Sequence, residues 1–279
     1  MKSFPLSFPL SFFKKILILS CVFGLVAACS KDDDEPAYVE RSVEEIYNTA
    51  YESLQKGDFR RSALEFDEVE RQHPYSIWAR RSMLMSAYAY YKQNKYADSI
   101  LTARRFLALH PGNKSAPYAY YLIAQNYYEQ ISDISRDQKN TELALQALDD
   151  VIRRYPDTDY ARDARLKRDL TVDHLAGKEM EVGRFYLNRH SYIAAINRFR
   201  NVILKYQTTS HTEEALHRIT EAYLALGIEP EAKAAAAVLG HNYPESSWYK
   251  DSYRMLVERD FSPQTEDVSW YSRIWKSIF

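Results

Sequence analysis

Apolar and small side chains recur at helical spacing ahead of five stop positions along the chain. The stops, 37 to 51 residues apart, are Pro74, Pro111, Pro156, Gln207 and Pro244. An aromatic ring precedes each stop, the fifth and eighth residues before it are apolar, and the twelfth is small. Such positions share one face of a helix, and proline ends a helix because it lacks a backbone N–H. The pattern predicts a series of helices, each with one apolar face.

Another helix precedes each of these, so the repeating unit is a helical hairpin. The first unit has a helix over about 43–56, a turn at Gly57 and Asp58, and a helix over 59–72. The second, third and fifth units span about 80–111, 117–156 and 212–244, and the fourth runs from about 159 to the stop at Gln207. A lone hairpin cannot bury its apolar face, so this period predicts stacked hairpins.

The fourth unit most closely resembles the tetratricopeptide repeat. That family's small and aromatic signature positions are occupied by Gly183, Tyr186, Tyr192, Ala195 and Phe199. The longer periods, and Gln207 in place of proline, depart from the family's pattern. The expected fold is all-α, a right-handed helical-repeat solenoid of about five tetratricopeptide-like hairpins.

Four segments interrupt or extend this array. Residues 131–140 form a polar insertion between the helices of the third unit, and the fourth unit opens with a long helix over about 159–188. A further helix over 246–258 would cover the last apolar face. In the tail, 261–279, apolar residues at 270, 271, 274, 275, 278 and 279 form one helical stripe. The tail is expected either to pack on the end of the solenoid or to bind a partner or a membrane surface.

The first 28 residues have the pattern of a secretory signal peptide. Lys14 and Lys15 precede a short apolar run that is too short to span a membrane as a helix. The run ends in Val26-Ala27-Ala28-Cys29, which resembles the lipobox of bacterial lipoproteins. We expect the mature chain to begin at an acylated Cys29. The alternative is an ordinary signal peptide in which this cysteine has no role.

After Cys29, a polar and acidic stretch over 29–40 is expected to be a flexible tether, followed by a repeat domain over 41–260. Several acyl chains would hold the protein firmly on a bilayer. Ser30, rather than Asp, follows the cysteine. By resemblance to enteric lipoproteins, this implies the outer membrane.

Charge and motifs argue against nucleic-acid binding and against catalysis. The net charge is −1, whereas nucleic-acid binding usually requires a basic face. The chain contains none of the common zinc-protease, CxxC, phosphate-loop or nucleophile-elbow motifs. We expect no catalytic residue, no metal site and no cofactor apart from the covalent lipid on Cys29.

The first helix of each repeat lines the concave surface of this architecture, and tyrosines recur there at equivalent positions. The predicted peptide groove comprises Tyr47, Tyr51, Tyr88, Tyr91, Tyr121 and Tyr128. Tyrosine combines apolar area with a hydroxyl group, which suits an extended or helical peptide. The alternative is that these rings pack between adjacent repeats.

The lipobox, the acidic tether and several short strings are together similar to the BamD (ComL/YfiO) family. The strings are residues 63–66 with His73-Pro74, 127–128 with 131–133 and 136–138, 153–156, 181–182, and 197–198. The inserted segment of the third unit is the most specific of them. The resemblance covers about 25–258 and leaves the aromatic tail unmatched.

This resemblance implies a non-catalytic scaffold of the outer-membrane β-barrel assembly machinery, lipid-anchored on the periplasmic leaflet of the outer membrane. The later repeats would bind periplasmic domains of the barrel-forming (BamA-like) subunit, and other assembly lipoproteins would join the complex. The early repeats would bind the C-terminal signal of unfolded outer-membrane proteins.

Asn197 and Arg198 are the candidates for partner docking, because a guanidinium can pair with a carboxylate through two hydrogen bonds. The alternative for Arg198 is a surface ion pair. The alternative function is that of another periplasmic repeat lipoprotein, which coordinates envelope or peptidoglycan enzymes.

Overall fold

The computed structural model describes residues 40–258, and this part of the chain contains eleven helices and no strand. Ten helices form five hairpins, and α12 (Ser247–Val257) follows them. The hairpins are α2 (Val43–Gln55) with α3 (Phe59–Gln72), α4 (Ile77–Lys92) with α5 (Tyr96–Leu109), α6 (Ala116–Tyr128) with α7 (Lys139–Arg154), α8 (Asp159–Asn188) with α9 (Tyr192–Lys205), and α10 (His211–Leu226) with α11 (Glu229–Asn242).

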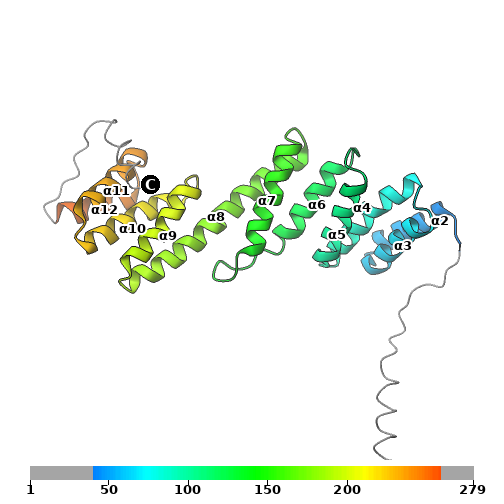
Figure 1. Ribbon diagram of the computed structural model, residues 1–279, viewed down its shortest axis with the longest axis horizontal. Helices are drawn as coiled ribbons and strands as arrows, with labels where there is room; N and C mark the ends of the chain where they lie inside the picture. The colour runs from blue at the N-terminus through cyan, green and yellow to red at the C-terminus, as the bar shows by residue number, and fades with distance from the viewer. Residues whose placement is uncertain (1–39, 259–279) are drawn as a thin grey trace, which may run out of the picture. The chain divides into compact units, whose positions relative to one another are not determined.

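Each helix from α2 to α11 packs on the next in chain order (Figure 1). The first helices of neighbouring hairpins also touch, from α2 against α4 to α8 against α10. Helix α12 packs on α10 and α11, and therefore covers the last hairpin as the sequence predicted. The all-α repeat fold is confirmed.

Local sequence explains where the helices begin and end. The side chain of Asp58 accepts a hydrogen bond from the backbone N–H of Arg61 and so caps the start of α3. Gly57 occupies the preceding turn with φ +80°, a left-handed conformation that glycine adopts without a steric cost. At the other end of α3, the backbone N–H of His73 donates to the carbonyl of Val69, four residues earlier. The aromatic residue before every stop makes this same bond.

The core includes the columns that the sequence pattern marked, together with buried residues of the first helices. In all five hairpins, the residues five, eight and twelve positions before the stop are at most 1% exposed. The largest of these side chains are Phe66, Phe106, Leu148, Phe199 and Leu239. Burial of a large apolar side chain contributes about 1.5–3 kcal/mol, so these columns supply much of the driving force for stacking.

Gly183 allows α8 and α9 to approach closely. A Cβ atom at this position would lie 2.4 Å from the ring of Phe199, which is fully buried. No side chain larger than hydrogen fits there unless that ring moves. The glycine and the phenylalanine of the repeat signature thus form one contact.

Helix α8 runs unbroken for 30 residues, through both Gly177 and Gly183. The segment between α6 and α7 lies against it: Lys178 Nζ donates to the carbonyl oxygen of Ser135 at 3.0 Å, and Ile134 lies beside Gly177. The insertion of the third repeat is therefore anchored to the first helix of the fourth.

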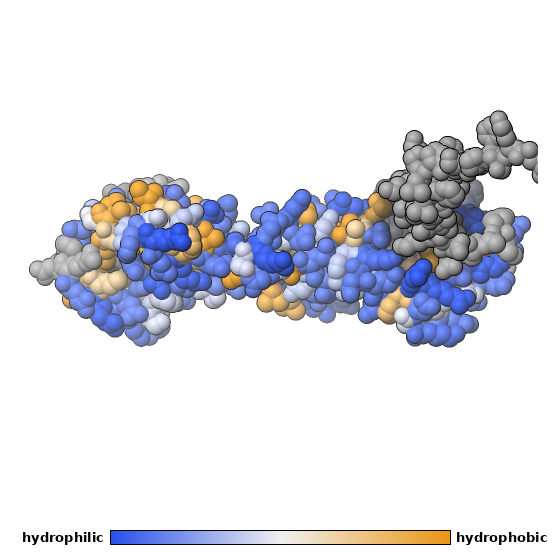
Figure 2. Space-filling view, turned by 90° about the horizontal axis from the view of Figure 1, so that it is seen from below, coloured by the Kyte–Doolittle hydropathy of each residue, from blue (hydrophilic) through white to orange (hydrophobic). Residues whose placement is uncertain are grey.

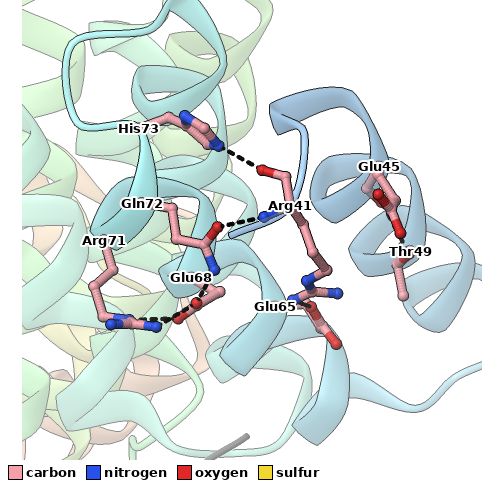
Figure 3. A network of polar contacts seen from close by, with 8 residues as sticks. All are labelled: Arg41, Glu45, Thr49, Glu65, Glu68, Arg71, Gln72 and His73. Atoms are coloured by element: carbon pink, nitrogen blue, oxygen red, sulfur yellow. Dashed lines mark hydrogen bonds and ion pairs between the residues drawn. The ribbon is translucent and has the colours of Figure 1, made fainter. Parts of the chain in front are cut away.

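A polar network joins Arg41 to the end of α3 (Figure 3). The backbone N–H of Arg41 donates to Gln72 Oε1 at 3.0 Å, and its guanidinium donates to Glu65 at 2.8 Å. The ring Nε2 of His73 lies 2.8 Å from the carbonyl oxygen of Arg41, which accepts its hydrogen. These three bonds fix the point at which the chain enters the first hairpin.

The face shown in Figure 2 is mainly hydrophilic, with separate hydrophobic patches. Among residues 40–258, no helix has the length and apolar character needed to cross a membrane. The predicted signal peptide, Cys29, most of the tether and the whole aromatic tail over 261–279 lie outside the described residues.

Candidate functional site

The predicted groove begins on α2, where two tyrosines one turn apart have different surroundings. Tyr47 is only 6% exposed, and its ring centroid lies 5.4 Å from that of Phe66 and 4.6 Å from that of Trp78. Tyr47 thus belongs to the core, and packing between repeats is its role. Tyr51 is 43% exposed and is available to a ligand.

On α4, Tyr88 and Tyr91 are half-buried, and their ring centroids are 6.3 Å apart. The hydroxyl of Tyr91 donates to Glu129 at 3.2 Å, and Gln125 donates to the same carboxylate at 2.9 Å. Burial is the main cause that raises the pKa of Tyr91, so its hydroxyl stays protonated and can donate. The hydrogen bond between Tyr91 and Glu129 joins α4 to the end of α6.

On α6, Tyr121 and Tyr128 flank a lysine from the next hairpin. The hydroxyl of Tyr121 donates to Asp163 at 2.6 Å, and Lys167 Nζ donates to that hydroxyl at 3.0 Å. The same Nζ lies 5.4 Å from the ring centroid of Tyr121 and 5.8 Å from that of Tyr128, within the range of cation–π attraction. A positive charge is therefore held between two tyrosine rings.

Two further tyrosines extend this arrangement, and the sequence analysis did not select them. Tyr160 lies 5.8 Å from Tyr118 and 5.2 Å from Tyr121 between ring centroids. Burial, with the neighbouring tyrosines, raises the pKa of Tyr118. Tyr118 lies three residues before Tyr121, on the same face of α6, and this spacing was the sequence signal that could have identified Tyr118.

We name the tyrosine surface as the accessible or half-buried rings on these first helices, together with the lysine between them. It comprises Tyr51, Tyr88, Tyr91, Tyr118, Tyr121, Tyr128, Tyr160 and Lys167. Four hairpins contribute to it, so its geometry depends on their stacking. Aromatic area with hydroxyl donors and one cation is suited to a peptide.

The second candidate surface lies on α9. Asn197 is exposed, while the side chain of Arg198 is 42% exposed and points to Glu179 of α8. The Nη1 of Arg198 lies 3.4 Å from Glu179, which also accepts a hydrogen bond from Asn201 at 3.0 Å. The contact with Arg198 is long, so the guanidinium can turn toward a carboxylate on a partner.

Within residues 40–258, no three His, Cys, Asp or Glu side chains are grouped so that they could hold a metal ion.

Comparison with protein families gives one match that covers most of the chain. The family model described as "YfiO: Outer membrane lipoprotein" matches residues 39–239. Three similar proteins carry the name "Outer membrane protein assembly factor BamD". The protein of Caulobacter vibrioides is 53% identical over 249 residues, 88% of this chain and 82% of the relative. That of Rickettsia prowazekii is 42% identical, covering 87% of this chain and 96% of the relative. That of Neisseria meningitidis is 32% identical, covering 94% of this chain and 99% of the relative.

Solved structures with some likeness are tetratricopeptide-repeat proteins of low sequence identity. A thermophilic repeat protein of Thermus thermophilus is 17% identical, with a TM-score of 0.36 over 77% of this chain and 99% of its own. A tetratricopeptide-repeat protein of Parabacteroides merdae is 12% identical, with a TM-score of 0.36 over 85% of this chain and 98% of its own.

Proposed function

Because the chain belongs to the YfiO family of outer-membrane lipoproteins, we propose that it is a non-catalytic scaffold of outer-membrane β-barrel protein assembly. The observation that carries this proposal is its extensive identity with proteins named as outer-membrane protein assembly factors. Those names describe assembly factors.

The anchor is a lipid on Cys29. The tether then provides eleven residues between this cysteine and Arg41, the residue that three hydrogen bonds attach to the first hairpin. A chain of that length spans at most about 40 Å when fully extended. The repeat domain is thus held close to the membrane that carries its substrates.

The ligand of the tyrosine surface is an extended segment of an unfolded outer-membrane protein with aromatic residues at its end. Each well-buried ring contributes roughly 1–2 kcal/mol, so three engaged rings contribute roughly 3–6 kcal/mol, which is below the about 8 kcal/mol of micromolar binding. Ordering costs weaken the complex further. Such an affinity suits a step in which the substrate must be passed on. Tyr47 is left out of this site because it is buried.

The later repeats bind the barrel-forming subunit, and Arg198 with Asn197 contributes to that contact. Both lie on α9, where Asn197 is exposed and Arg198 is half-exposed, and this supports the assignment. A carboxylate on the partner would replace the long contact of Arg198 with Glu179 by a closer pair. Other assembly lipoproteins are further partners in the complex.

A peptide titration tests substrate binding. A synthetic peptide with aromatic residues at its C-terminal end is titrated against the wild type and against Tyr51→Ala, Tyr88→Ala and Tyr121→Ala, with helical circular dichroism as the folding control. We expect at least one folded variant to bind about tenfold more weakly. Unchanged affinity in all three would place the peptide site elsewhere.

A further inference from the structure

A cavity of about 480 Å³ lies where α4 begins and where α5 passes into α6. Its lining residues are Ile77, Arg80, Arg81, Leu84, Phe106, Asn113, Lys114 and Ser115. The four residues from α4 are spaced i, i+3, i+4 and i+7, so they form one face of that helix. Leu84 and Phe106 are buried and form an apolar floor, whereas polar and charged groups form the rim.

The rim of this cavity is positively charged. Arg80, Arg81 and Lys114 line it, and no described acidic residue does. Within residues 40–258, none of the three forms an ion pair with a carboxylate, although the guanidinium of Arg81 lies 5.6 Å from the ring centroid of Tyr47. Elsewhere on the repeats most of the arginines are paired with acids, for example Arg105 with Glu70. Uncompensated cations around a cavity favour an anionic ligand.

Large apolar side chains stand exposed beside these cations. Tyr75 is 99% exposed and Ile77 is 69% exposed, both at the turn between α3 and α4. Leu109, at the end of α5, is 59% exposed. Since α4 and α5 are antiparallel neighbours, the start of one lies beside the end of the other. This edge of the first two hairpins combines exposed apolar residues with cations.

We propose that this edge binds the membrane surface, with a phospholipid phosphate in the cavity and Tyr75, Ile77 and Leu109 in the headgroup region. Basic residues beside apolar ones are the composition of interfacial membrane contacts, where each lysine or arginine adds attraction to anionic lipid. The proposal rests on the lipid anchor, because a tether that reaches at most about 40 Å keeps the first hairpins near the bilayer. The contact would fix the orientation of the repeats on the membrane.

The test uses the lipid-anchored full chain in vesicles of phosphatidylethanolamine and phosphatidylglycerol. Acylated Cys29 is the only cysteine of the mature chain, so one introduced cysteine carries an environment-sensitive dye. The label is placed at Ile77→Cys or at Ile193→Cys, since both side chains are 69% exposed. Quenching by headgroup-labelled lipid is then measured. We expect strong quenching at position 77 and weak quenching at 193.

Charge variants test whether the cations of the cavity cause the membrane contact. Arg80→Gln with Lys114→Gln should lower the ratio of docked to undocked protein roughly thirtyfold. Arg60→Gln with Arg61→Gln removes two exposed cations from the opposite end of the first hairpin and should change little. Helical circular dichroism confirms that each variant is folded.

Equal quenching at 77 and 193, or no effect of the Arg80 and Lys114 changes, would overturn the proposal. If these changes weaken binding of the aromatic-ended peptide and leave quenching intact, the cavity binds a peptide carboxylate instead, which also overturns it. Intact mass reports the lipid on Cys29 independently, so failure of the anchor is distinguished from failure of the membrane contact.

Discussion

The hydroxyl of Tyr121 donates to Asp163 over 2.6 Å and thereby joins the first helix of the third hairpin to that of the fourth. Burial alone would raise the pKa of Asp163, but the hydrogen bonds from Lys167 and Tyr121 outweigh it and lower the pKa. The carboxylate is therefore charged at neutral pH and holds both donors. Orientation of the tyrosine surface depends on this contact between repeats.

Replacing Tyr121 by Phe removes the hydroxyl and keeps the ring. Loss of one hydrogen bond to a charged group should lower stability by about 1–2 kcal/mol, and the melting temperature by a few degrees. Tyr51→Phe is the matched control, because Tyr51 is exposed and makes no hydrogen bond with the described residues. Equal melting temperatures for the two variants would show that the Tyr121–Asp163 bond contributes nothing to stacking.

Gly183→Ala should destabilise the fourth hairpin. The added methyl group would lie 2.4 Å from the Phe199 ring, and overpacking of this kind costs about 1–3 kcal/mol. Phe199→Leu in the same chain should recover part of that loss, as a double-mutant cycle measured by urea unfolding would show.

Gly112→Ala serves as the control for this substitution, because a Cβ atom there meets nothing within 4 Å. If Gly183→Ala unfolds at the same urea concentration as Gly112→Ala, the close approach of α8 and α9 is not required.

His217 should make the stability of the last repeat depend on pH. Burial lowers the pKa of His217, and the positive charge of Arg218 lowers it further. The ring Nδ1 of His217 is hydrogen-bonded to the hydroxyl of Ser252 at 2.8 Å, and the ring centroids of His217 and Trp248 are 5.0 Å apart. Because the folded pKa lies below the unfolded one, the stability contribution is complete above about pH 6.5 and is lost as pH falls toward the folded pKa. Between about pH 8 and about pH 5.5, the melting temperature should fall further for the wild type than for His217→Gln. Parallel falls in the two proteins would refute this.

Arg198→Ala should weaken co-purification of the barrel-forming subunit by roughly tenfold or more, if its guanidinium pairs with a carboxylate at the interface. Glu179→Gln removes the carboxylate that Arg198 contacts within the chain. It therefore distinguishes a role of Arg198 in holding Glu179 from a role in docking the partner protein. If Arg198 serves only to hold Glu179, both variants lose the partner equally. If it docks the partner, Glu179→Gln leaves co-purification intact while Arg198→Ala reduces it.

The sequence was sufficient to predict the helices and the part of the core that the second helices contribute. The columns before the stops coincide with fully buried residues, and α3, α8 and α12 lie at or within one residue of their predicted bounds. This succeeded because stop residues and apolar faces are set by local chain geometry.

The tyrosine surface could be predicted only in part. Tyr47 and Tyr51 belong to one predicted row, yet Trp78 from the next hairpin buries the first and leaves the second exposed. Lys167 was not foreseen, because its contact with Tyr121 joins residues 46 apart and follows from how the hairpins stack. Contacts of this kind are properties of the assembled fold and not of a repeat.

The measurement that tests the central claim most directly is a pull-down of the full chain from detergent-solubilised envelopes, with the co-purifying proteins identified by mass spectrometry. An assembly scaffold should bring down the barrel-forming subunit at near-stoichiometric amount, together with other assembly lipoproteins. Recovery of peptidoglycan enzymes without that subunit would contradict the account.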